Sequence, residues 1–138
     1  MIVPQHRTAS AGFSLMEIMA ALLILGLIMA VAVPSYLAFM EGARVRSTDA
    51  SLIVMKNAIN LYYMEQGQYP TKLKDLVEKP KTETKRWHQY LDKLPQDGWT
   101  KDFVYKILPA GGKRPYELYS HGPNGPEGSP EERISVWG

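Results

Sequence analysis

Residues 13–33 read FSLMEIMAALLILGLIMAVAV, an apolar run whose only charged residue is Glu17. At the helical rise of about 1.5 Å per residue, this run spans roughly 30 Å, which matches the hydrocarbon core of a bilayer. It is longer than the roughly 7–15 apolar residues of an ordinary secretory signal peptide, and its small residue, Gly12, precedes it instead of following it. The sequence therefore predicts a membrane-spanning helix near the N-terminus.

Glu17 is the residue of this run that needs an explanation. A carboxylate within a membrane helix costs about 3 kcal/mol on insertion scales, so it normally has a partner or stays near the hydrated interface. Cleavage after Gly12 makes Phe13 the N-terminal residue and places Glu17 on the same side of the helix as the new ammonium group. In a packed filament this carboxylate could neutralise the terminal amine of a neighbouring subunit. The alternative is a plain signal anchor with an incidental Gly-Phe junction.

Residues 12–17, GFSLME, resemble the class III signal of type IV pilins and pseudopilins. The resemblance implies that a prepilin peptidase cuts after Gly12 and methylates the new N-terminal Phe13. It also divides the chain into a leader peptide (1–12), a transmembrane and filament-core helix (13–34) and a periplasmic head that includes the amphipathic half of the long helix (35–138). Glu17 and Pro34 are the residues expected to act in assembly.

The charges that flank the span do not set its orientation. Arg7 precedes the span, whereas Arg44 and Arg46 follow it within the range that the positive-inside rule counts. Taken alone, the rule favours the opposite topology or neither. The resemblance implies a cytoplasmic N-terminus and a periplasmic head on a single-pass protein of the bacterial inner membrane, which becomes a periplasmic filament when assembled.

A second helical pattern follows the span. Apolar residues recur at spacings of seven, three, four and three, which places them on one face of a helix that packs under a domain. These residues are Val45, Leu52, Met55, Ile59 and Tyr62. The helix is expected to end near Gly67, a C-cap candidate, with Pro70 just beyond it.

Pro34 lies inside this long helix. A proline there removes a backbone hydrogen bond and kinks or locally opens the helix. Helices of the pilin family carry a proline at this position of the mature chain. The hypothesis is that the helix around Pro34 loses regularity in the assembled filament, and a filament map with continuous helical density from Leu23 to Met40 would contradict it.

The remainder predicts a small α+β head. Two short helices, at Lys72–Glu78 and Arg86–Lys93, precede three strands at residues 103–108, 116–120 and 134–137, which are rich in Tyr, Val, Ile and Phe. One long helix followed by consecutive strands gives an antiparallel sheet packed on that helix, the ladle of type IV pilin-like proteins. The side chains expected to be buried in this way are Tyr105, Ile107, Leu118, Val136 and Trp137.

Three blocks of the head are similar to the type II secretion major pseudopilin family, general secretion pathway protein G. They are residues 61–71 (LYYMEQGQYPT), 76–80 (LVEKP) and 87–99 (WHQYLDKLPQDGW). The family pattern in the last block is Leu-Pro-x-Asp-Pro-Trp-Gly. This chain has Gly98 in place of the Pro and Thr100 in place of the Gly, which affects the expected loop geometry and leaves the resemblance intact.

Residues 121–132, HGPNGPEGSPEE, form the one stretch with the composition of a ligand site. The resemblance implies a calcium loop, with Asn124 where the family has Asp and Glu131-Glu132 where it has two Asp. These replacements weaken, alter or remove the site. The alternative is a solvated acidic turn that needs no cofactor and is stiffened by its three prolines, Pro123, Pro126 and Pro130.

Composition excludes other functions. The net charge is +2 with no basic stripe, which gives no case for nucleic-acid binding, and the absence of Cys excludes disulfides and thiol nucleophiles. The three histidines, His6, His88 and His121, are isolated, and no hydrolase, zinc or nucleotide motif is present. Asp92 and Asp97, near His88, are interpreted as surface helix and turn residues, so an enzyme is not expected.

The resemblance implies a structural subunit of the type II secretion pseudopilus, which polymerises from the inner membrane into a filament that drives exoprotein export. Its implied partners are further copies of itself, membrane lipid before assembly, the prepilin peptidase, the inner-membrane assembly platform and the minor pseudopilins. The alternative is a subunit of a type IV pilus or DNA-uptake (competence) pilus. Such pilins commonly close their C-terminal loop with a disulfide, which this chain cannot form.

Overall fold

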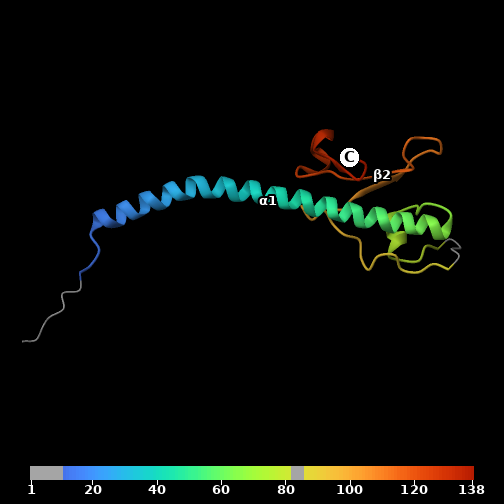
Figure 1. Ribbon diagram of the computed structural model, residues 1–138, viewed down its shortest axis with the longest axis horizontal. Coiled ribbons are helices and arrows are strands. Elements are labelled where there is room, and N and C mark those ends of the chain that lie inside the picture. Colours follow the sequence, from blue (N-terminus) through green and yellow to red (C-terminus); the bar gives the residue numbers. More distant parts are fainter. Residues whose placement is uncertain (1–10, 82–85) are drawn as a thin grey trace, which may run out of the picture. The chain divides into compact units, whose positions relative to one another are not determined.

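The computed structural model describes residues 11–81 and 86–138, so that most of the predicted leader, residues 1–10, lies outside the described residues. The elements in chain order are α1 (Leu15–Gln66), the 3₁₀ helix η1 (Leu73–Leu76), β1 (Val104–Ile107), β2 (Tyr116–Ser120), the 3₁₀ helices η2 (Gly125–Glu127) and η3 (Pro130–Glu132), and β3 (Ile134–Ser135) (Figure 1). The chain divides into two compact units after Phe39, within α1. The predicted region boundaries at residues 12 and 34 stay predictions.

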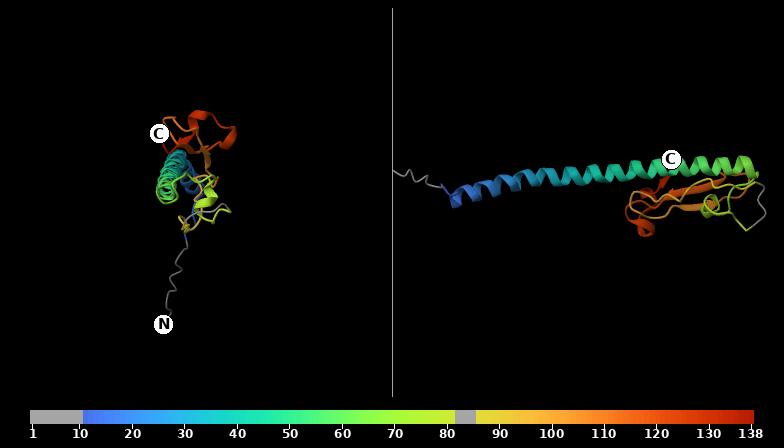
Figure 2. Two further views of the ribbon diagram at one scale, coloured as in Figure 1. Left: turned by 90° about the vertical axis from the view of Figure 1, so that its right-hand side faces the viewer. Right: turned by 90° about the horizontal axis from the view of Figure 1, so that it is seen from below.

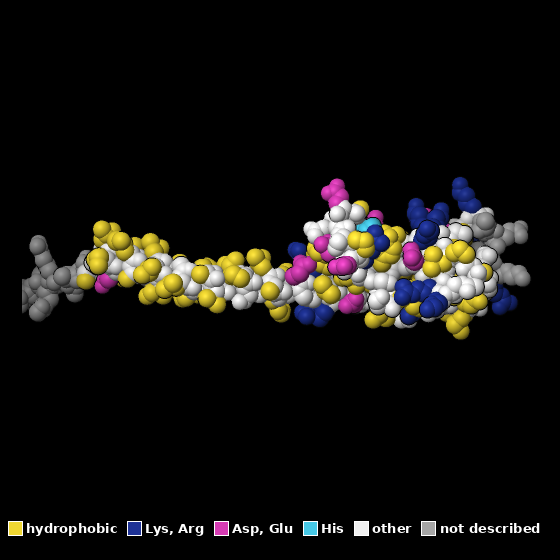
Figure 3. Space-filling model, turned by 90° about the horizontal axis from the view of Figure 1, so that it is seen from above, with side chains coloured by type: hydrophobic (Ala, Val, Ile, Leu, Met, Phe, Trp, Pro, Cys, Tyr) yellow, Lys and Arg dark blue, Asp and Glu magenta, His cyan; other side chains and the backbone are white. Residues whose placement is uncertain are grey.

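The N-terminal unit consists of the first half of α1. Every side chain from residue 11 to residue 39 is exposed, large apolar ones included, and Figure 3 shows hydrophobic side chains along this stretch. By length and composition the helix is able to cross a membrane. Pro34 lies inside α1, and its ring nitrogen has no hydrogen to donate to the carbonyl of Ala30.

In the second unit, the C-terminal half of α1 lies alongside the strands (Figure 2). The face predicted from the apolar spacing is the buried one: Leu52, Met55, Ile59 and Tyr62 are at most 2% exposed, and Val45 is partly buried. The remaining buried apolar residues of the core are Ala58, Leu76, Phe103, Tyr116 and Leu118. The predicted end of the helix is also confirmed. Gly67 adopts a φ of 76° and donates its N–H to the Tyr63 carbonyl, at 2.8 Å.

The sheet has the order β1-β2-β3, and both pairs are antiparallel. The predicted α+β architecture, a long helix packed on a three-stranded antiparallel sheet, is confirmed. The strand at residues 116–120 has the predicted bounds, whereas β1 and β3 are shorter than predicted. In the register, Tyr105 pairs with Leu118 and Ile107 with Tyr116.

Burial of Ile107 is a wrong prediction, because this side chain is 41% exposed. Strand β1 ends at Ile107, and the connection that follows, residues 109–114, is itself exposed. Leu118 is fully buried as predicted. The other three residues predicted to be buried, Tyr105, Val136 and Trp137, pack against the core and are partly buried.

The predicted helix at Arg86–Lys93 is also wrong. The described segment is irregular, and its backbone bonds go to another element: Tyr90 and Leu91 both donate to the Leu76 carbonyl, at 2.9 and 3.0 Å. The Trp87 indole adds a bond to the carbonyl of Asp75, at 2.9 Å. The segment is therefore attached to η1 instead of forming helical bonds of its own. The first short helix exists, but as the single 3₁₀ turn Leu73–Leu76.

Candidate assembly site and head loops

The start of α1 holds the predicted processing and assembly residues. Gly12 and Phe13 precede the helix and are exposed, Phe13 by 85%. Ser14 and Glu17 form a reciprocal pair. The backbone N–H of Ser14 donates to Glu17 Oε2 at 2.9 Å, and the N–H of Glu17 donates to Ser14 Oγ at 3.2 Å. This is the geometry of a capping box, which satisfies two backbone donors at a helix start.

The capping box directs the Glu17 carboxylate toward the first residues of the helix. Its oxygen lies on the N–H of Ser14, the residue directly after Phe13. A carboxylate at a helix N-terminus is also favoured by the helix dipole. The side chain predicted to meet a terminal ammonium is therefore held at the end of the helix where that ammonium would be created.

A second apolar stripe on α1 was missed by the sequence analysis. Val54, Leu61 and Met64 are 49%, 42% and 80% exposed. Their spacings of seven and three place them on one helical face, on the side of the helix opposite the buried residues. The signal was visible in the sequence, because the same 3.6-residue periodicity that identifies the buried stripe identifies this one. These side chains are available for contact with other molecules.

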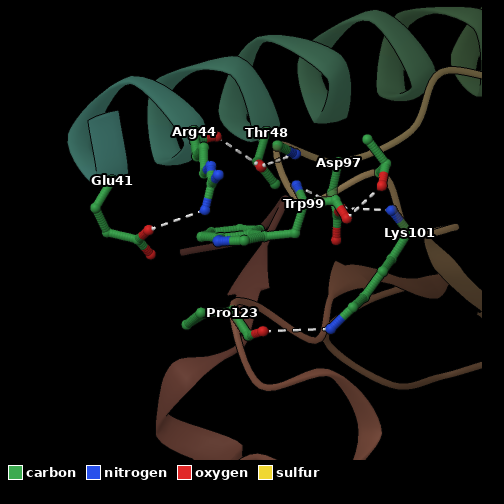
Figure 4. A network of polar contacts seen from close by, with 9 residues as sticks. Glu41, Arg44, Thr48, Asp97, Trp99, Lys101 and Pro123 are labelled. Atoms are coloured by element: carbon green, nitrogen blue, oxygen red, sulfur yellow. Dashed lines mark hydrogen bonds and ion pairs between the residues drawn. The ribbon is translucent and has the colours of Figure 1, made fainter. Parts of the chain in front are cut away.

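The turn at residues 97–101 is organised by a buried carboxylate (Figure 4). Asp97 is 5% exposed. Its Oδ1 accepts the backbone N–H groups of Trp99 (3.0 Å) and Lys101 (2.8 Å), and its Oδ2 accepts the hydroxyl of Ser120 (2.6 Å). The same hydroxyl oxygen accepts the N–H of Gly122, at 3.0 Å. Asp97 is therefore not the surface residue predicted from sequence; it joins this turn to the end of β2.

The two departures from the family pattern lie in this turn, and the structure accounts for the one at Gly98. The N–H of Gly98 donates to Thr48 Oγ1 at 2.9 Å, a bond that proline is unable to make. A Cβ at Gly98 would also overlap the carbonyl of Arg44 in α1. Thr100 has a φ of 60°, the left-handed region that glycine adopts freely and a β-branched residue does not.

The predicted calcium residues lie in the loop between β2 and β3. The side-chain amide of Asn124 donates to Glu132 Oε2 at 2.9 Å, and Glu131 is exposed. Calcium takes six to eight oxygen ligands, whereas here an amide N–H of Asn124 already occupies the Glu132 oxygen. Within residues 11–81 and 86–138, no group of three or more His, Cys, Asp or Glu side chains is placed to hold a metal ion. The residues present do not fit a calcium cage.

An aromatic cluster surrounds Tyr116, the first residue of β2, in the core. Tyr116 lies about 5–6 Å, centroid to centroid, from the rings of Tyr69, Tyr105 and Trp137. Burial raises the pKa of Tyr116 to about 12 and raises the pKa of Tyr105 further. Tyr105 donates its hydroxyl to the Pro70 carbonyl at 2.8 Å, whereas the buried Tyr116 hydroxyl has no partner among the described residues.

The two histidines within the described residues have structural contacts. His88 Nε2 lies 2.8 Å from Glu65 Oε2, and its ring stacks on Tyr90 at 4.4 Å. His121 meets the Tyr119 ring edge-on at 5.4 Å. The Tyr90 hydroxyl also donates to Glu65 Oε2, at 2.8 Å. The contacts of His88 and Tyr90 with Glu65 attach the irregular segment after η1 to the end of α1.

Comparisons with known proteins agree on one family. The family model for type II secretion system (T2SS) protein G matches residues 35–137. Type II secretion system core protein G of Pseudomonas aeruginosa is 34% identical, with 95% of this chain and 96% of the relative covered; that of Escherichia coli strain K12 is 31% identical, with 92% and 90% covered.

A solved structure supports the same conclusion. The crystal structure of the major pseudopilin from the type 2 secretion system of enterohaemorrhagic Escherichia coli matches with a TM-score of 0.59 and 28% identity, covering 70% of this chain and 85% of that chain. These matches do not favour the pilus or DNA-uptake alternative. The chain belongs to the family of type II secretion system protein G.

Proposed function

We propose that this chain is the major structural subunit of a type II secretion pseudopilus. The observation that carries the proposal is one continuous arrangement: a processing motif at residues 12–17, then an exposed apolar helix, then a head of the protein G family. An apolar helix with every side chain exposed needs either lipid or other protein around it. A subunit that leaves the membrane for a filament core exchanges one apolar environment for the other.

The proposed route begins in the inner membrane, with a cytoplasmic N-terminus and a periplasmic head. The prepilin peptidase cuts between Gly12 and Phe13 and methylates the new amine. The capping box with Ser14 supplies the Glu17 carboxylate with a backbone donor while it has no neighbour. In the filament the carboxylate then pairs with the Phe13 ammonium of the next subunit, and a misplaced subunit is rejected because it leaves a buried charge unpaired.

The surface that fits contact with other copies is the exposed stripe of Val54, Leu61 and Met64. The stripe belongs to the second half of α1, and its side chains are apolar and exposed. Pro34 lies within the exposed first half of α1 and lowers the cost of changing the helix there during packing. The assembly platform and the minor pseudopilins are the further partners that this function requires, and no step of it needs a cofactor or catalysis by this chain.

The first test is the N-terminal mass of the protein purified from cells that carry its own prepilin peptidase. A mature chain that starts at methylated Phe13 is the expected result. An intact chain that starts at Met1 or Ile2 would make the protein an ordinary signal anchor and would remove the basis of the filament proposal.

The second test separates ion pairing from helix capping. Glu17→Val is expected to insert into the membrane but to give few filaments, because the charge partner is lost. Ser14→Ala is the matched control, since it removes the capping hydroxyl and keeps the carboxylate; its filament yield is expected to stay near that of the wild type. Equal yields from Glu17→Val and wild type would rule out the pairing role.

A further inference from the structure

The loop between β2 and β3 is contacted by the positively charged side chain of Lys101, which lies before β1 in the sequence. The ammonium of Lys101 donates to the Pro123 carbonyl at 3.3 Å. It lies directly over Gly125, where a Cβ would stand 2.7 Å from Nζ. The close-up in Figure 4 shows the Lys101 side chain extending from the turn at residues 97–101 to this loop. We propose that the Lys101 ammonium holds this loop in its fold, so that the loop of this chain does not require calcium.

The position of Lys101 is fixed at its backbone. Its N–H donates to Asp97 Oδ1 at 2.8 Å, and its carbonyl accepts the N–H of Asp97 at 2.9 Å. Because the carboxylate of Asp97 is buried and also bonded to Ser120, the turn that carries Lys101 is anchored to the core. The backbone of Lys101 is therefore already fixed, which reduces the conformational entropy lost when its ammonium group bonds the loop.

The loop is shaped to receive this side chain. Gly125 is buried and has a φ of 66°, and the absence of a Cβ there leaves the room that the ammonium fills. The carboxylate of Glu132 reaches into the same loop, where it accepts the amide of Asn124 and lies next to Gly128. The loop thus carries one negative charge inside it and receives one positive charge from Lys101.

The same arrangement disfavours a divalent cation. Calcium takes six to eight oxygens, and a carbonyl or carboxylate oxygen that already accepts a hydrogen bond must share its lone pairs or give up that bond to become a ligand. Here the Pro123 carbonyl and one Glu132 oxygen are both occupied. A fixed ammonium in the loop also repels a second cation. The residues expected to bind calcium, Asn124, Glu131 and Glu132, thus lie in a loop that already receives a positive charge from Lys101.

The experiment uses the full chain in detergent micelles. Thermal melting by circular dichroism and hydrogen exchange of the amides of residues 121–133 are measured with excess EGTA and with excess calcium chloride. The variants are Lys101→Met, which keeps the length of the side chain and removes its charge, and Lys106→Met. Lys106 is exposed on β1, and its variant controls for the loss of one positive charge.

Wild-type protein is expected to give the same melting temperature and the same exchange in both solutions. Lys101→Met is expected to melt about 5 °C lower and to exchange faster in residues 121–133, whereas Lys106→Met should match the wild type. The proposal is overturned if calcium raises the wild-type melting temperature and EGTA reverses the rise. It is equally overturned if Lys101→Met and Lys106→Met behave alike.

A third variant covers the case in which Lys101→Met does not fold. Lys101→Arg keeps the charge and a donor group, and it should fold and stay indifferent to calcium; a calcium requirement in this variant would contradict the proposal. Because all measurements are made on the unassembled chain, their outcome is independent of filament formation, and failure here would leave the pseudopilus function untouched.

Discussion

The hydroxyl of Thr48 lies between two backbone groups from different parts of the chain. It accepts the N–H of Gly98 at 2.9 Å and donates to the carbonyl of Arg44 at 2.8 Å. Thr48 itself is fully buried, at 0% exposure. The Thr48 side chain thus attaches the turn at residues 97–101 to α1. This turn contains Asp97 and Lys101 and fixes their positions.

Replacing Thr48 by valine should destabilise the chain by about 1–3 kcal/mol, because the Gly98 N–H is left without an acceptor in a part-buried site. Thr48→Ser is the matched control, since it keeps the hydroxyl and loses only a methyl group. Urea denaturation followed by tryptophan fluorescence measures both variants. A Val variant as stable as the Ser variant would show that the hydrogen bond contributes nothing.

Replacing Thr100 with glycine should stabilise the folded chain. Its φ of 60° lies in the left-handed region, which costs a non-glycine residue about 1–2 kcal/mol. Part of this gain is offset by the extra freedom of glycine in the unfolded chain, so Thr100→Gly should raise the free energy of unfolding by about 0.5–1 kcal/mol. Thr100→Ala is the control, because alanine keeps the Cβ and should give little gain. Equal stability of the Gly and Ala variants would refute the argument.

The N-terminal helix, its end at Gly67 and the buried face of α1 were predictable because each depends on residues close together in the sequence. Length, the spacing of apolar residues and a C-cap glycine are local signals, and they act in the same direction here. Strand β2 was predicted for the same reason. The capping box of Ser14 and Glu17 and the exposed stripe through Leu61 were equally local, although they were not identified.

The errors have a common cause in contacts between distant parts of the chain. The segment after residue 86 is not helical because Tyr90 and Leu91 donate to Leu76. Asp97 is buried because Ser120, 23 residues away, bonds its carboxylate. Neither contact can be predicted from the spacing of residues along the sequence. The role of Lys101 was missed likewise, since its partner, Pro123, lies 22 residues further along the chain.

Substitution of Asp97 should destabilise the head more than substitution of any other polar residue of the head. Asp97→Ala removes the acceptor of the Trp99 and Lys101 N–H groups and of the Ser120 hydroxyl, and we expect a loss of about 3 kcal/mol or more. Asp97→Asn keeps the shape and one acceptor oxygen and should lose clearly less. Chemical denaturation of both variants tests this order, and a loss from Ala no larger than from Asn would show that the carboxylate bonds are not the cause.

The aromatic cluster predicts sensitivity to alkaline pH. Burial raises the pKa of Tyr116 to about 12 and that of Tyr105 further, whereas both titrate near 10 in the unfolded chain. Below pH 10 both states hold the protons, and the stabilising contribution is fully present. Above pH 10 the unfolded chain releases protons that the folded chain retains. Stability should therefore fall as the pH rises from about 10 to 12, by up to about 1.4 kcal/mol per pH unit for each tyrosine.

Tyr116→Phe isolates one of these two groups. The Tyr116 hydroxyl is buried without a partner among the described residues, so its removal should leave the stability at pH 7 unchanged or slightly higher. The variant should also lose less stability between pH 10 and 12 than the wild type, because it lacks the Tyr116 proton that the folded chain retains and the unfolded chain releases. Urea midpoints measured across this range give both quantities. Identical slopes for variant and wild type would mean that the ionisation of Tyr116 is not linked to unfolding.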